Sequence, residues 1–89
     1  MALGSMEYKE LVVEFGRDLS RIADELYRAT TEELPPDRRA GVIIGGKRKV
    51  REYQAFLGRV EGARRLEVER RFGDSVDEIS GFLRTLGEA

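Results

Sequence analysis

The apolar positions in the first third of the chain recur at intervals of three and four residues, which is the spacing of one helix face. These positions are Tyr8, Val12, Phe15, Leu19, Ile22, Leu26 and Ala29. The pattern predicts a helix over about 7–33. Leu34-Pro35-Pro36 should end it, because proline has no backbone N–H to donate and disfavours helix in the residue before it.

Two further segments show the same periodicity. The second helix is predicted over about 47–72 and the third over about 75–86, because Gly73 fits a C-terminal cap and Ser75 with Glu78 matches a capping box. Residues 34–46, rich in proline and glycine, are expected to form a linker. Within it, Val42-Ile43-Ile44 is interpreted as an apolar plug against the helices or another subunit.

These elements predict an all-α fold: a long antiparallel two-helix hairpin followed by a short C-terminal helix. Residues 1–5 are interpreted as a vector remnant before a second methionine, and residues 6–89 as a single helical domain. The first two helices would each be roughly 40 Å long at 1.5 Å per residue. A compact chain of this size is only about 25–30 Å across. We therefore expect leftover apolar surface, covered by oligomerisation.

Composition narrows the chemistry further. The chain contains no histidine, cysteine or tryptophan, which excludes zinc–thiolate sites, disulfides, a thiol nucleophile and an imidazole base. No apolar run is long enough to cross a membrane. Gly41 to Lys47 matches the spacing of a phosphate-binding loop, but Arg48 stands where that loop needs Ser or Thr, and no strand precedes it. We expect a cytoplasmic protein that is not an enzyme and holds neither cofactor nor metal.

Charge is distributed unevenly along the chain. The totals of 16 basic and 17 acidic side chains nearly cancel, yet residues 38–71 contain 11 basic and 4 acidic side chains. Two interpretations stay open: the basic segment binds nucleic-acid phosphates, or it pairs with the acidic first helix within the chain or across subunits. The candidate nucleic-acid-binding residues are Arg38, Arg39, Lys47, Arg48, Lys49 and Arg51.

Two glycines four residues apart, Gly58 and Gly62, lie within the predicted second helix. Each costs about 1 kcal/mol of helix propensity, so we expect them to form a packing notch that lets another backbone approach closely. The predicted packing and oligomer interface comprises Phe15, Leu19, Ile22, Leu26, Tyr53, Leu57, Gly58 and Gly62.

The segment YQAFLGRVEGARRLE resembles the Tyr-x-x-x-x-Gly-x-x-x-Gly segment of small helical structural proteins of tailed bacteriophages, with Tyr53, Gly58 and Gly62 at the recurrent positions. The resemblance implies a virion or head–tail assembly component, placed in the host cytoplasm or the virion, whose partners are copies of itself or a larger protein assembly. One alternative is a small DNA-packaging protein that uses the basic segment. A further alternative is a phage-encoded inhibitor of a host protein.

Overall fold

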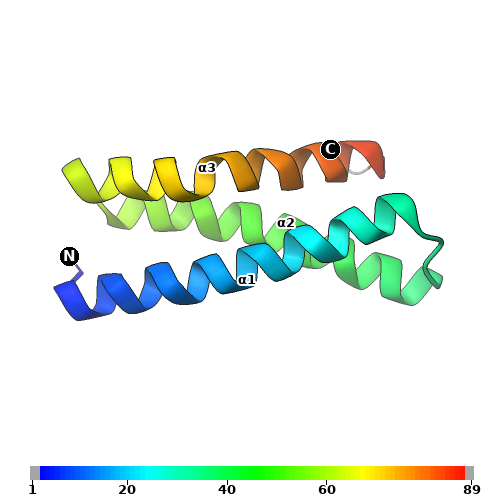
Figure 1. Cartoon of the computed structure of the whole chain (residues 1–89), viewed down its shortest axis with the longest axis horizontal. Helices are drawn as coiled ribbons and strands as arrows, with labels where there is room; N and C mark the ends of the chain where they lie inside the picture. The colour runs from blue at the N-terminus through cyan, green and yellow to red at the C-terminus, as the bar shows by residue number, and fades with distance from the viewer. Residues whose placement is uncertain (1–2, 88–89) are drawn as a thin grey trace.

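The heptad pattern of the first segment produces one long helix, and two more helices of similar length pack beside it. The computed structural model describes residues 3–87, which form α1 (Ser5–Thr31), α2 (Pro36–Arg59) and α3 (Gly62–Thr85). The helices run up, down and up along one axis of a molecule measuring 42 × 19 × 18 Å (Figure 1). Each helix contacts both others. The predicted all-α class is confirmed.

All seven predicted apolar positions of α1 are buried. They meet a matching stripe of α3, formed by Val68, Phe72, Val76, Ile79 and Leu83. At the middle of the bundle the ring of Phe15 lies 5.0 Å from Phe72 and 5.7 Å from Phe56, centroid to centroid. Each helix therefore contributes one ring to this cluster, and the core is closed by three helices instead of two.

The predicted linker 34–46 is mostly helical, which corrects the sequence expectation. Pro36 occupies the first turn of α2, where a missing N–H costs nothing because the first amides of a helix have no partner within it. The apolar plug is part of this helix, with Val42 and Ile43 buried and Ile44 exposed. Only residues 32–35 connect α1 to α2. Burial of the apolar side chains overrides the low helix propensity of the glycines.

The predicted second helix over 47–72 is also wrong, because it is broken near its middle. Val60 and Glu61 are extended. Gly62 has a φ of +57°, a backbone conformation that residues with a Cβ rarely adopt. The expected break at Gly73 and Ser75 does not occur, and α3 continues through both residues. The short C-terminal helix is thus a full-length third helix, held across residue 73 by core side chains on either side.

The N-terminal segment contacts the bundle. Leu3 is buried, and its carbonyl accepts a hydrogen bond of 2.6 Å from Arg64 Nη1 on α3. The ring of Tyr8 lies 4.7 Å from the same guanidinium, and its hydroxyl donates to Glu67. The interpretation of residues 1–5 as a vector remnant stays a prediction; residues 1–2, and residues 88–89 at the other end of the predicted domain, lie outside the described range.

Candidate functional site

The predicted interface residues of α1 lie inside the chain's own core. Phe15, Leu19, Ile22 and Leu26 are all buried against α2 and α3. From α2, Tyr53 and Leu57 are half-buried against the same core. Burial raises the pKa of the Tyr53 hydroxyl above its usual value of 10.0. These residues pack against one another within the chain, so they do not offer an apolar surface to a second copy.

Gly58 and Gly62 do not form a packing notch within the chain. A Cβ built on either glycine would meet no atom within 4 Å. Gly62 is required for a different reason, since its positive φ starts α3 after the extended Val60 and Glu61. Gly58 is exposed near the end of α2. The α2–α3 turn therefore accounts for one of the two glycines, and close backbone approach within the described residues accounts for neither.

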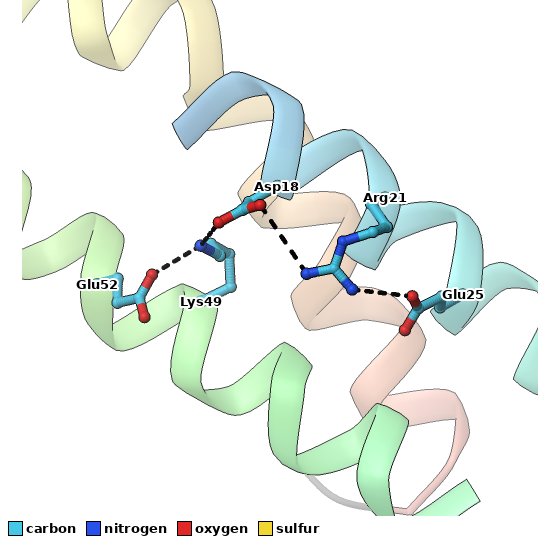
Figure 2. A network of polar contacts seen from close by, with 5 residues as sticks. All are labelled: Asp18, Arg21, Glu25, Lys49 and Glu52. Atoms are coloured by element: carbon cyan, nitrogen blue, oxygen red, sulfur yellow. Dashed lines mark hydrogen bonds and ion pairs between the residues drawn. The ribbon is translucent and has the colours of Figure 1, made fainter. Parts of the chain in front are cut away.

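Lys49, one of the predicted nucleic-acid-binding residues, is buried between α1 and α2. Its Nζ lies 2.7 Å from Glu52 Oε2 and 3.4 Å from Asp18 Oδ2, as Figure 2 shows. The same nitrogen sits 5.1 Å from the centroid of the Phe15 ring. The pair with Asp18 joins the basic segment to the acidic first helix, as one of the two interpretations of the charge pattern expects. Lys49 is consequently unavailable to an external phosphate.

The network around Lys49 extends along the surface of α1. Asp18 also lies 3.9 Å from Arg21, which pairs with Glu25 at 3.1 Å (Figure 2). Both carboxylates that meet Lys49 are about half exposed, with side-chain exposures of 51% for Asp18 and 46% for Glu52. Water therefore shares the solvation of these anions. Within this network the Lys49–Asp18 pair is the contact that joins α2 to α1.

The other predicted basic residues divide into two groups. Arg39 donates from Nη2 to the carbonyl of Leu86 at 3.2 Å, which ties the start of α2 to the end of α3, and Lys47 is half-buried. Arg38, Arg48 and Arg51 are exposed, and within the described residues they make no hydrogen bond or ion pair. Three of the six predicted residues thus remain available to a partner.

Two of these arginines lie on a continuous outward stripe of α2. Its residues repeat at intervals of three and four, opposite the buried side of the helix, and all are exposed. We call this stripe the α2 outer face; it comprises Gly41, Ile44, Arg48, Arg51, Ala55 and Gly58. Sequence reasoning missed it because residues 36–46 were assigned to a linker. The signal in the sequence is a second heptad repeat, made of small residues, two arginines and Ile44.

The net charge of α2 separates it from its neighbours. It contains seven basic and two acidic residues, whereas α1 contains four and six, and α3 five and five. Some arginines of α1 and α3 also pair with carboxylates four positions away, as in Arg28–Asp24 at 3.4 Å and Arg65–Glu69 at 3.1 Å. The outer faces of α1 and α3 are partly self-neutralised, and that of α2 is positive.

Catalytic or metal chemistry would need a pocket or a cluster of ligating side chains. A shallow groove of about 280 Å³ between α1 and α2 has a floor of Leu11, Phe15 and Phe56, and its buried Lys49 is already paired. Between residues 3 and 87, no three carboxylates converge as a metal site would require. Burial, and then the hydrogen bond to Glu67, raise the pKa of the Tyr8 hydroxyl above 10.0, which keeps that group neutral.

Comparison with protein-family models, curated proteins and solved structures finds no match to this chain. No helix of the described range contains a stretch that is both long enough and apolar enough to cross a bilayer. The positive α2 outer face is therefore the feature from which a function can be argued.

Proposed function

We propose that this chain is a non-enzymatic docking protein, of the assembly type expected from its sequence, which presents the α2 outer face to an anionic partner. The observation that carries the proposal is the exposure of Arg48 and Arg51 at the centre of a helix with a charge of +5, without a carboxylate partner in the described residues. A rigid helix holds both side chains on one face. The backbone of this chain therefore loses little conformational freedom when a partner binds.

Self-association through the buried apolar face of α1 is not part of this proposal. It was expected from apolar surface left over on a two-helix hairpin, and α3 covers that surface. The large exposed apolar residues are distributed over all three helices: Met6, Val13 and Tyr27 on α1, Ile44 on α2 and Leu66 on α3. The bacteriophage context and a location in the host cytoplasm or virion stay proposals that rest on the short sequence resemblance alone.

Nucleic acid is the second candidate partner, favoured by the same arginines. With Lys49 buried and Arg39 bound to a carbonyl, the contacts available to phosphates are fewer than the sequence predicted. Affinity for a duplex should then fall with salt less steeply than for a protein with six phosphate contacts, because each contact contributes a slope of about −0.9.

The proposal is tested by binding of two polyanions, polyglutamate and a mixed-sequence DNA duplex, over a salt series. We expect at least one to bind at low salt, and Arg48→Ala/Arg51→Ala to weaken it roughly tenfold, since two exposed ion pairs contribute about 1–2 kcal/mol together. The matched control is Arg17→Ala/Arg70→Ala, which removes the same charge from exposed positions on α1 and α3. Equal weakening by both double variants, or no binding of either polyanion, would contradict the proposal.

A further inference from the structure

The spacing and composition of the α2 outer face point to one class of anionic partner. We propose that it binds an acidic amphipathic helix of another protein, lying lengthwise along α2. This inference rests on the proposed function and names the partner of the same surface. Three observations support it: the repeat along the helix, the apolar and small positions at its two ends, and the charge at its centre.

The repeat of the α2 outer face is that of a helix–helix contact. From Gly41 to Gly58 the six residues of this stripe follow one another at three- and four-residue intervals, the spacing at which one helix packs along another. The stripe is roughly 26 Å long at 1.5 Å per residue. α2 therefore has two such stripes, an inner one packed against α1 and α3 and an outer one that no described residue covers.

The ends of the stripe fit apolar side chains of a partner helix. Ile44 is 55% exposed and lines a shallow groove of about 420 Å³, whose other lining residues are the apolar Leu34, Pro36, Ala40 and Ile43 and the basic Arg39 and Lys47. A Cβ added at Gly41 or Gly58 would meet nothing within 4 Å, so bulky partner side chains can approach the α2 backbone at both ends. A nucleic-acid backbone would gain little from covering Ile44, because its phosphates and sugars are polar.

The centre of the stripe selects for negative charge. Arg48 and Arg51 lie one turn apart, and their guanidinium groups can each bind a carboxylate in a two-point contact. A second copy of this chain docked face to face would bring these arginines against their own counterparts. Charge therefore disfavours a symmetric α2–α2 dimer and favours a helix that carries glutamate or aspartate opposite them.

The test uses three probes: a synthetic peptide of Leu/Glu heptads, a scrambled peptide of identical composition, and a mixed-sequence DNA duplex. We expect the heptad peptide to bind about tenfold more tightly than the scrambled one, because only the ordered repeat presents leucines and glutamates on the same face. Circular dichroism should show the bound heptad peptide gaining helix. The duplex should bind more weakly than the heptad peptide at the same salt concentration.

Ile44→Ala provides the variant that separates this inference from general charge attraction. It should weaken the heptad peptide about fivefold, through loss of half-exposed apolar area, and leave duplex binding unchanged. Leu66→Ala is the matched control, because Leu66 is 61% exposed on α3, away from the stripe. Equal affinity of the two peptides, no effect of Ile44→Ala, or tighter binding of the duplex would overturn the inference and leave the proposed function standing. Failure of all three probes to bind at low salt would overturn both.

Discussion

Gly45 and Gly46 are adjacent in α2, yet replacing each with alanine should change the free energy of unfolding in opposite directions. Gly46 faces the core: a Cβ there would lie 2.8 Å from Leu26 Cδ1 and 3.4 Å from Leu83 Cδ2. Carbon atoms prefer about 3.5–4.0 Å, so the side chain of Leu26, which is fully buried, would have to shift within the core to admit the Cβ. A Cβ added at Gly45, one residue earlier, would meet nothing within 4 Å.

The magnitude follows from two opposing contributions. Alanine favours a helix interior over glycine by about 1 kcal/mol, so Gly45→Ala should raise the free energy of unfolding by that amount. At Gly46 the same gain is offset by overpacking, which typically costs about 1–3 kcal/mol, so Gly46→Ala should lower the free energy of unfolding by about 1 kcal/mol. The two variants should therefore differ by about 2 kcal/mol although each adds one methyl group.

Urea unfolding followed by far-UV circular dichroism measures this difference directly. Thermal unfolding should agree, with the midpoints moving apart, since about 1 kcal/mol corresponds to roughly 4–8 °C in a domain of this size. Equal stability of the two variants, or a stabilising Gly46→Ala, would refute the placement of Gly46 against Leu26. Residues 36–46 would then lack one of the core contacts, beside those of Val42 and Ile43, that hold them in a helix.

Three further predictions concern the turn, a buried tyrosine and the buried lysine. Gly62→Ala should lower the free energy of unfolding by about 1 kcal/mol because its φ is positive, whereas the exposed Gly58→Ala should raise it slightly, contrary to a packing role for Gly58; urea midpoints check both. Burial raises the pKa of the Tyr8 hydroxyl in the folded protein, so the stabilisation that the neutral hydroxyl provides is complete below pH 10.0 and is lost as the pH rises through the pKa of the folded state. In urea titrations above pH 10.0, the wild type should therefore lose stability more steeply than Tyr8→Phe. Parallel pH profiles of the two proteins would contradict this. Lys49→Met should change stability by less than about 1 kcal/mol, because its half-exposed carboxylate partners can be hydrated, while Lys49→Ala should cost about 2 kcal/mol in lost packing over Phe15; equal losses in thermal melts would argue against it.

The candidate site was only partly predictable from the sequence. The basic segment was visible as a run of charge, but the availability of each side chain depends on which side of the helix faces the core. Lys49 and Arg48 are neighbours in sequence, yet one is buried against Phe15 and the other is exposed, because successive helical residues point about 100° apart. Without the helical assignment of residues 36–46, that phase could not be extended to Gly41 and Ile44.

The sequence by itself determined the helical class and the buried face of α1, because a strict three-and-four repeat is a local property that needs no knowledge of the partner. Tertiary structure decided where α2 begins and where α3 begins. Pro36 and Gly73 are ambiguous signals that suit either a helix or a break, and the burial of Val42, Ile43, Phe72 and Val76 against neighbouring helices determines which occurs. Those burial energies arise between segments far apart in the chain, so no local pattern contains them.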